Sequence, residues 1–347
     1  MTPSAPRVLL VKLSSLGDVV HAMAAVQDMV RAVPGVQVDW VVEKAFAPLV
    51  ARCHGVGQVI PCELRRWRRA PFAGETRAAW AQFKAQLQAQ SYDAVIDLQG
   101  LTKSALVAWL ARTTSHGRKY ALANQTDGSG YEAPTRWVAD VAVQLEPHVH
   151  AVQRSRLLCA QAMGYHIEGP AHFGLHAQAG PMSAPKRGAG GDNGSLVALV
   201  HGTSRADKEW PLEHWIALGQ RLNAQGHTVA LAHGSARERA LSEAIAQQLA
   251  SAVVWPDLSL DALTDTMAQC AGVIGVDSGL SHMAVALDLP HVQIYNFDTA
   301  WRTGVQAPHQ QCVYAQPTPT VDQVWQTWCA CIAARTDDTP AALGGQA

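Results

Sequence analysis

The first half of the chain alternates short apolar runs with longer segments whose apolar residues recur at helical spacing. Short runs rich in Val, Leu and Ile, of the kind that form buried strands, occupy residues 8–13, 38–42, 58–61 and 93–98. Helical spacing covers residues 14–32, 45–52, 76–90, 101–110, 136–145 and 148–163. This alternation predicts a mostly parallel sheet covered by helices on both faces, a Rossmann-like α/β half.

The second half repeats the alternation with a different sequence. Strands are predicted at residues 196–200, 228–232, 253–255, 273–276 and 291–295, and helices at 211–223, 237–249, 260–270, 280–287 and 321–333. Residues 116–135 hold few apolar residues and several Gly, Asn and Asp, so they predict a long loop. Residues 177–195 are rich in Gly, Ala, Pro and Ser without hydrophobic periodicity, which predicts a linker.

A chain of 347 residues exceeds the usual size of one hydrophobic core, so two domains are expected. We predict an N-terminal domain over residues 1–180, a linker over 181–195, a C-terminal domain over 196–335 and a frayed tail over 336–347. No apolar run reaches the ~18 residues of a membrane span, and the start of the chain is too polar for a signal peptide. A cytoplasmic protein is therefore expected.

The 7 cysteines are spread along the chain without a Cys-x2-Cys pair, so their spacing indicates neither a zinc site nor a disulfide framework. We expect reduced thiols and no metal. The dinucleotide fingerprint G-x-G-x-x-G does not follow the first strand, and Gly100–Ser104 lacks the P-loop spacing. The sequence therefore supports neither a dehydrogenase nor a P-loop enzyme.

Charge is unevenly distributed, although the net charge is only −1. Residues 1–180 hold 18 Lys and Arg against 13 Asp and Glu, whereas the remainder holds 9 against 15. The first half is thus expected to favour an anionic partner or surface. The near-neutral total counts against nucleic acid as that partner.

The densest charge run is residues 63–69, Glu-Leu-Arg-Arg-Trp-Arg-Arg. Four arginines around a tryptophan suit multivalent recognition of phosphates or carboxylates. On this interpretation the indole is available for stacking or for an interface. The competing interpretation is a solvated surface loop.

The turn after the first strand, Lys12 to Asp18, carries one carboxylate at the carboxyl end of a strand, where open α/β sheets bind ligands. Asp18 is either a residue that caps the following helix, as most acids at a helix start are, or a functional carboxylate. Asp97 ends another strand and Lys103 lies in the helix after it. In a parallel sheet both fall on the same side as Asp18.

Two segments of the second half predict an anion site. Residues 201–211, His-Gly-Thr-Ser-Arg-Ala-Asp-Lys-Glu-Trp-Pro, follow a strand and supply hydroxyls, a glycine and Lys208 before a helix. Residues 276–282, Val-Asp-Ser-Gly-Leu-Ser-His, place Asp277 and His282 around a strand end and a helix N-terminus. The alternatives are ordinary helix capping in both segments and a core role for His282.

Taken together, these motifs resemble the heptosyltransferases of glycosyltransferase family 9, which have the GT-B fold of two Rossmann-like domains facing each other across a cleft. The resemblance covers almost the whole chain, in segments 8–21, 39–43, 60–68, 92–104, 208–211 and 276–282. The Arg-Arg-Trp-Arg block favours the type I branch, which uses Kdo2-lipid A, over the type II branch.

The resemblance implies an inverting, metal-independent enzyme without a cofactor. It would move L-glycero-D-manno-heptose from ADP-heptose to the inner Kdo of Kdo2-lipid A in lipopolysaccharide inner-core biosynthesis. The implied general base is Asp18. The implied donor-binding residues are Thr203, Ser204, Lys208, Glu238, Leu258, Asp277, Ser278, Gly279 and His282. The implied acceptor-binding residues are Ser15, Gly17, Arg65, Arg66, Arg68, Arg69 and Lys103.

A single displacement needs one base within about 2.6 to 3.2 Å of the acceptor hydroxyl and stabilisation of the leaving diphosphate. Asp18 and the donor residues are predicted on different domains, so domain closure is expected to assemble the site. The basic first half suits an anionic membrane surface. Peripheral attachment to the inner face of the inner membrane is expected.

Some segments depart from the family's pattern. Ser278 stands where threonine is expected, and residues 116–135 and 296–302 differ from the corresponding family loops. The acceptor contacts and the role of Asp298 therefore stay open. Two alternatives remain: a family 9 transferase such as a type II enzyme with another acceptor, and a non-catalytic protein that binds a sugar nucleotide.

Overall fold

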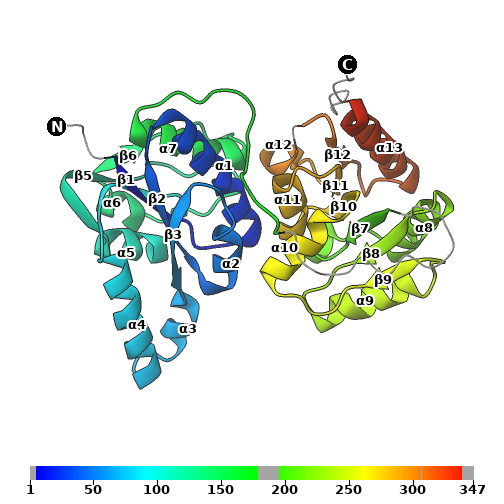
Figure 1. Cartoon of the computed structure of the whole chain (residues 1–347), viewed down its shortest axis with the longest axis horizontal. Coiled ribbons are helices and arrows are strands. Elements are labelled where there is room, and N and C mark those ends of the chain that lie inside the picture. The colour runs from blue at the N-terminus through cyan, green and yellow to red at the C-terminus, as the bar shows by residue number, and fades with distance from the viewer. Residues whose placement is uncertain (1–4, 179–194, 306, 338–347) are drawn as a thin grey trace, which may run out of the picture. The chain divides into compact units, whose positions relative to one another are not determined.

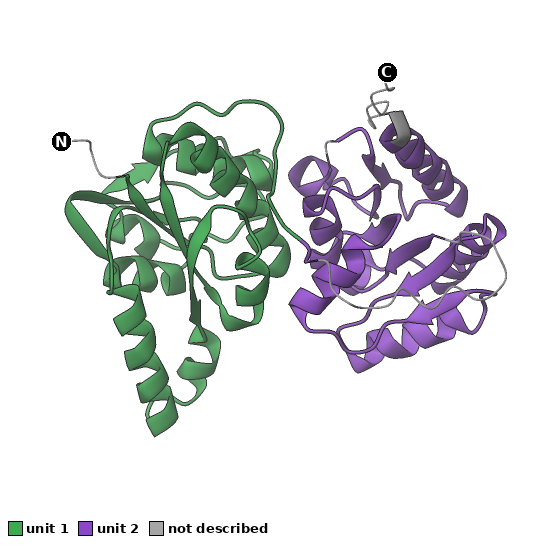
Figure 2. Ribbon diagram, viewed as in Figure 1, with its two compact units in different colours: residues 1–176 green, residues 177–347 purple. Residues whose placement is uncertain are grey.

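The computed structural model describes residues 5–178, 195–305 and 307–337, and these residues form two compact units (Figure 1, Figure 2). Unit 1 comprises residues 1–176 and unit 2 residues 177–347. The predicted linker over 181–195 lies outside the described residues except for Ser195. Both units are α/β, and each contains a six-stranded parallel sheet, in agreement with the predicted alternation.

The sheet of unit 1 is built around β1 (Arg7–Val11), in which the side chains from Val8 to Val11 are completely buried. A run this apolar suits a central strand covered by helices on both faces. The strand order is β3-β2-β1-β4-β5-β6, with all neighbours parallel. The other strands are β2 (Gln37–Glu43), β3 (Val56–Cys62), β4 (Ser91–Asp97), β5 (Arg112–Leu122) and β6 (Val141–Val143).

Two helices of unit 1 are joined by a buried ion pair. Arg156 on α7 donates from Nε to Oδ2 of Asp28 on α1 at 2.6 Å, and both side chains are almost fully buried. This pair holds α7 against α1. The helical elements of the unit are α1 (Leu16–Ala32), η1 (Lys44–Phe46), α2 (Ala47–Val50), α3 (Leu64–Arg69), α4 (Gly74–Leu87), α5 (Thr102–Leu110), α6 (Pro134–Val138) and α7 (Ala151–Met163).

Two of the secondary-structure predictions for unit 1 were wrong. The segment predicted as a long loop begins as a strand, because β5 continues to Leu122 and pairs with both β4 and β6. The helix predicted at residues 136–145 ends early, at Val138, and residues 141–143 form β6. Both errors concern the outer part of the sheet, where β5 is half-exposed and polar and β6 has only three residues.

The sheet of unit 2 has the order β12-β11-β10-β7-β8-β9, again with all neighbours parallel. Its strands are β7 (Leu196–Val200), β8 (Thr228–Leu231), β9 (Ala252–Val254), β10 (Gly272–Val276), β11 (His291–Tyr295) and β12 (Gln310–Tyr314). Its helices are η2 (Ala206–Lys208), α8 (Leu212–Ala224), α9 (Ala236–Ala246), α10 (Leu260–Ala268), α11 (Gly279–Ala286), α12 (Ala300–Thr303) and α13 (Val321–Asp337).

The C-terminal end of unit 2 extends beyond its predicted elements. Strand β12 and helix α12 were not predicted, and α13 continues past the predicted end at residue 333. Of the predicted tail over 336–347, only residues 336 and 337 are described, and both are helical. All seven cysteines are free thiols, as predicted.

Each sheet reverses its strand order once, between β1 and β4 in unit 1 and between β7 and β10 in unit 2. Ligands of open α/β sheets bind at the carboxyl ends of the strands at such a switch point. The turns after β1, β4, β7 and β10 are therefore the places to look for a site. Within the residues described, no helix is long and apolar enough to span a membrane.

Candidate active site

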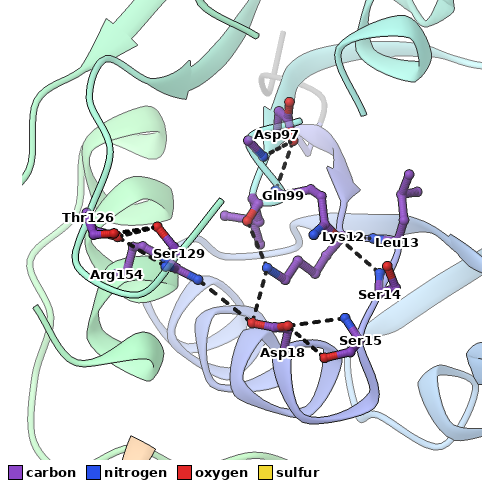
Figure 3. A network of polar contacts seen from close by, with 12 residues as sticks. Lys12, Leu13, Ser14, Ser15, Asp18, Asp97, Gln99, Thr126, Ser129 and Arg154 are labelled. Carbon is purple, nitrogen blue, oxygen red and sulfur yellow. Dashed lines mark hydrogen bonds and ion pairs between the residues drawn. The ribbon is translucent and has the colours of Figure 1, made fainter. Parts of the chain in front are cut away.

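The carboxylate of Asp18 lies in the first turn of α1, directly after the end of β1 (Figure 3). Its Oδ2 accepts hydrogen bonds from the backbone N–H of Ser15 at 3.1 Å and from the Ser15 hydroxyl at 2.9 Å. An acid at this position caps the free N–H group that precedes a helix and complements the helix dipole. The side chain nevertheless keeps 33% of its surface exposed, so the same carboxylate caps α1 and faces solvent.

Two cations approach the other oxygen of this carboxylate. Lys12 Nζ lies 3.7 Å and Arg154 Nη2 lies 3.9 Å from Oδ1 of Asp18 (Figure 3). Lys12 is buried and also donates to the carbonyl of Leu98 at 3.1 Å, while Arg154 donates to the Thr126 hydroxyl at 3.1 Å. The sequence interpretation assigned no role to either cation.

These neighbours determine the charge state of Asp18. Burial by itself raises the pKa of Asp18, but the Lys12 ammonium, His21 and the two hydrogen bonds from Ser15 outweigh burial. The pKa of this carboxyl group is therefore held well below its ordinary value. Burial lowers the pKa of Lys12, and the charge of Asp18 opposes that effect. Asp18 is consequently ionised throughout the neutral range.

Gln99 and Asp97 fix the ends of β1 and β4 to each other. Gln99 Oε1 accepts from the backbone N–H groups of Leu13 and Ser14, each at 3.0 Å (Figure 3). Asp97 accepts from the N–H groups of Gln99 and Gly100 at 2.9 and 3.1 Å. Asp97 is only 1% exposed, so its role is to hold this turn. Burial raises the pKa of Asp97 to about 6, although hydrogen bonds and Lys12 oppose the rise.

Lys103 joins the same edge of the sheet, as predicted for a parallel arrangement. Its Nζ donates to the Ser14 hydroxyl at 2.9 Å, one residue from the N-cap Ser15. Burial, followed by the charge of Arg65, lowers the pKa of Lys103. Gly17 lies buried in the first turn of α1. The predicted acceptor residues Ser15 and Gly17 therefore lie in the same helix start as Asp18, and Lys103 contacts the turn before it through Ser14.

The arginine block forms α3 rather than a loop, and it starts at the carboxyl end of β3. All four arginines of this block are exposed: Arg65, Arg66, Arg68 and Arg69. The predicted availability of the indole was wrong, because Trp67 is only 6% exposed and packs against Trp80 and Phe83 with ring centroids 5.5 Å apart. Trp67 anchors α3, and the arginines point outward.

In unit 2 the residues after β7 and β10 meet at Asp277. Lys208 Nζ donates to Oδ2 of Asp277 at 2.5 Å, and His282 Nε2 lies 3.2 Å from Oδ1. The Thr203 hydroxyl reaches the backbone carbonyl of Asp277 at 3.5 Å. Ser278 is the N-cap residue of α11, which begins at Gly279. Burial raises the pKa of Asp277, but His282 and Lys208 outweigh burial and hold it well below its ordinary value.

Glu238 lies at the same edge of the sheet, next to Gly202. Its Oε2 accepts from the Gly234 N–H at 2.7 Å. A Cβ placed on Gly202 would meet the Glu238 carboxyl carbon at 2.8 Å, so a larger residue here would displace this carboxylate. Ser204 is exposed in the turn after β7, and Leu258 is half-buried between β9 and α10. No described hydrogen bond or ion pair joins these last two residues to Asp277.

Further polar groups of this cluster were not predicted. Gln293 Nε2 donates to Oδ1 of Asp277 at 3.3 Å, and the Thr303 hydroxyl donates to the same oxygen at 3.4 Å. Asn296 donates to the backbone carbonyls of Asp207 and Glu209, each at 3.0 Å, and thereby holds the segment that carries Lys208. Among the described residues, no group of His, Cys, Asp and Glu is arranged to hold a metal ion.

Two Rossmann-like units, with a partly exposed carboxylate at the switch point of one and a Lys-Asp-His cluster at that of the other, have the fold of the GT-B glycosyltransferases. Residues 80–331 match glycosyltransferase family 9 (heptosyltransferase), and the chain belongs to this family. It is therefore a glycosyltransferase, as the resemblance implied.

The chain is similar to known heptosyltransferases both in sequence and in structure. The chain is 38% identical over 290 residues to lipopolysaccharide heptosyltransferase 1 of Escherichia coli K12, covering 83% of this chain and 87% of that protein. It is 37% identical over 305 residues to lipopolysaccharide heptosyltransferase 1 of Pseudomonas aeruginosa, covering 88% and 82%. Among solved structures, E. coli heptosyltransferase WaaC with ADP is 32% identical, with a TM-score of 0.81 over 92% of this chain and 98% of that chain.

Proposed function

We propose that this enzyme transfers L-glycero-D-manno-heptose from ADP-heptose to the inner Kdo sugar of Kdo2-lipid A, with inversion at the anomeric carbon. Membership of the heptosyltransferase family and the similarity to lipopolysaccharide heptosyltransferase 1 support the donor and the acceptor class. The observation that carries the proposal is the position of Asp18, a partly exposed carboxylate beside two cations at the switch point of unit 1.

In the proposed step, Asp18 accepts the proton of a Kdo hydroxyl while the hydroxyl oxygen attacks the anomeric carbon of heptose. The new glycosidic bond forms as the bond from that carbon to the diphosphate oxygen breaks, and ADP leaves with the electron pair. One displacement inverts the anomeric configuration. This step balances without a metal or a cofactor.

Lys208 and the start of α11 are the groups that we assign to the diphosphate of the donor. The ammonium now lies against Asp277, and a diphosphate beside it would compete for the same charge. The free N–H groups of a helix start and the Thr203 and Ser204 hydroxyls are suitable donors to phosphate oxygens. We assign Glu238 to the ribose, Leu258 to the adenine, and Asp277 and His282 to the heptose.

The acceptor is expected to change the basicity of Asp18. Kdo carries a carboxylate, and lipid A carries phosphates, so the acceptor brings negative charge toward the cations Lys12, Lys103 and Arg154. An anion that shares Lys12 and Arg154 weakens their stabilisation of the Asp18 carboxylate, and the pKa of Asp18 then rises toward a value suited to a general base. Acceptor binding would thereby activate the base.

The excess of basic residues in the first half supports peripheral attachment to the anionic cytoplasmic face of the inner membrane. Each Lys or Arg close to such a surface contributes about 1 kcal/mol. The exposed arginines of α3 are the densest group available for this attraction and for the acceptor phosphates.

The test is a transfer assay with purified protein, ADP-heptose and two acceptors, Kdo2-lipid A and its already heptosylated product. We expect product only with Kdo2-lipid A, and the same rate with excess EDTA. Product only with the heptosylated acceptor would assign the enzyme to the type II branch. Nucleotide binding without product from either acceptor would favour a non-catalytic binding protein.

A further inference from the structure

The connection between α3 and α4 exposes an apolar side chain that the transfer reaction does not use. Residues 70–74 read Ala-Pro-Phe-Ala-Gly and carry no charge. Phe72 is 90% exposed, more than any other large hydrophobic side chain of the described residues. Helices α3 and α4 form a hairpin that extends away from the sheet of unit 1, and Phe72 lies in its turn (Figure 1).

The hairpin is a packed element. Trp67 of α3 is enclosed by Trp80 and Phe83 of α4, and all three pairs of ring centroids lie 5.5 to 5.7 Å apart. Aromatic contacts of this kind add stability beyond simple area burial. The fold therefore provides an aromatic cluster that encloses Trp67 and Phe83 yet leaves Phe72 in water. All of residues 70–74 are exposed, so the turn presents an uncharged apolar stretch with a phenyl ring at its centre to a partner.

The charges around the turn indicate what that partner is. Exposed arginines flank residues 70–74 on both sides: Arg65, Arg66, Arg68 and Arg69 precede them, and Arg77 follows. The acids nearby are Glu63, which pairs with Arg66 at 3.2 Å, and Glu75. An apolar turn with arginines on both sides is complementary to an anionic bilayer. The guanidinium groups can bind lipid phosphates, and the aromatic ring can enter the boundary between headgroups and acyl chains.

We propose that the α3–α4 hairpin docks on an anionic lipid bilayer by inserting Phe72 between the headgroups. The arginines of α3 then lie at the level of the phosphates, and the carboxyl end of β3, from which α3 starts, lies next to the membrane surface. This docking rests on the proposed function in one respect, since the acceptor assigned there is a membrane lipid. The occupant is the bilayer rather than a second copy of the chain.

The experiment measures co-sedimentation of the full chain with vesicles of phosphatidylcholine containing 30 mol% phosphatidylglycerol, without acceptor or donor. For Phe72→Ser we expect about tenfold weaker partitioning, because one phenyl ring no longer leaves water. The double variant Arg68→Gln/Arg69→Gln is expected to weaken both the preference for phosphatidylglycerol and the sensitivity to salt. The matched control is Trp137→Ser, whose side chain is 78% exposed on α6 and should leave partitioning unchanged.

A second readout separates this proposal from the proposed function. Phe72→Ser should transfer heptose to a deacylated, water-soluble Kdo2 acceptor at the wild-type rate, and its melting temperature should equal that of the wild type. If the wild type transfers heptose to no acceptor but binds vesicles through Phe72, the proposed membrane docking is supported and the proposed heptose transfer is contradicted. Wild-type partitioning of Phe72→Ser, or an equal loss for Trp137→Ser, would overturn the docking. A shift from dimer to monomer caused by Phe72→Ser without lipid would instead assign the turn to self-association.

Discussion

At the scale of single residues, the central feature is a carboxylate whose charge is stabilised from two sides. Ser15 donates two hydrogen bonds to one oxygen of Asp18, and Lys12 and Arg154 approach the other. The low pKa that results keeps Asp18 ionised but makes it only weakly basic in the free enzyme. The pKa of Asp18 rises again only if the bound acceptor competes for Lys12 and Arg154.

The first prediction concerns the pH dependence of transfer in Lys12→Met. Lys12 is the strongest of the groups that lower the pKa of Asp18, so its removal raises that pKa. The acid limb of kcat/KM, which reports the free enzyme, should move up by about one pH unit or more. The control is Lys119→Met, since Lys119 also donates to a backbone carbonyl, that of Trp109, at 3.0 Å. An unmoved acid limb in Lys12→Met would contradict the assignment of the base.

A second prediction concerns stability and the buried Asp97. Its pKa of about 6 in the folded chain exceeds the ordinary value of 3.8, so folding takes up a proton between these values. The stability that Asp97 contributes is complete below about pH 4 and is lost as the pH rises through 6. The loss is roughly 2 to 3 kcal/mol.

Asp97→Asn should remove this pH dependence. The amide oxygen can still accept from Gln99 and Gly100. The Ser104 hydroxyl, which donates to Oδ2 of Asp97, can turn its proton to the Leu101 carbonyl and accept from the amide N–H instead. Urea unfolding at pH 4.5 and pH 7.5 checks the prediction, with the wild type losing more stability than the variant. Parallel losses in the two proteins would show that Asp97 is ionised in the folded state.

At the scale of elements, α3 depends on one buried indole. The helix has only six residues, too few for stability in isolation, and four of them are exposed arginines. Trp67→Ala should remove about 3 to 5 kcal/mol of packing and release α3 from α4. Limited trypsin digestion should then cut after Arg68 and Arg69 much faster than in the wild type.

Trp137→Ala is the control for this digestion, because an exposed tryptophan contributes little packing. It should leave both the digestion rate and the melting temperature within error of the wild type. Equal protection of the arginines in Trp67→Ala would mean that other contacts hold α3.

The elements that the sequence predicted are those whose apolar residues lie close together along the chain. Buried central strands such as β1 and β7 consist almost wholly of Val, Leu and Ala, so their pattern is unambiguous. In contrast, β5 reads Arg-Thr-Thr-Ser-His-Gly-Arg-Lys-Tyr-Ala-Leu, because much of it is exposed and only its last residues are buried. Such a strand is recognised by its pairing with β4, which the sequence does not display.

The same argument applies to the candidate site. Asp18, Lys208 and Asp277 were predicted because each lies in a short polar turn after an apolar strand. Arg154 was missed because it is an arginine within a helix, and its partners Asp18 and Thr126 are remote in sequence. The burial of Trp67 was missed for the same reason, since Trp80 and Phe83 lie in the next helix.

At the scale of the whole molecule, the two units have similar sheets but different proposed roles: unit 1 binds the acceptor and unit 2 binds the donor. Each has its own core and its own switch point, and all residues assigned to the donor belong to unit 2. ADP should therefore slow amide hydrogen exchange after β7, β8 and β10. At about 100 times its Kd, the expected stabilisation is about 2.7 kcal/mol.

Exchange in the strands of unit 1 should be unchanged by ADP, which serves as the internal control of that experiment. Protection at the end of β1 with ADP alone would contradict the assignment of the donor to unit 2. Added acceptor, by contrast, is expected to protect the turn that contains Ser15 and Asp18.

The most direct test of the account is the turnover of Asp18→Asn with ADP-heptose and Kdo2-lipid A. Asparagine keeps an oxygen that accepts both Ser15 hydrogen bonds, so α1 stays capped while proton acceptance is lost. We predict a fall in turnover of about 10² to 10⁴, with the Kd for ADP-heptose, measured by calorimetry, within twofold of the wild type. Wild-type turnover by Asp18→Asn would show that Asp18 only caps the helix and that the base lies elsewhere.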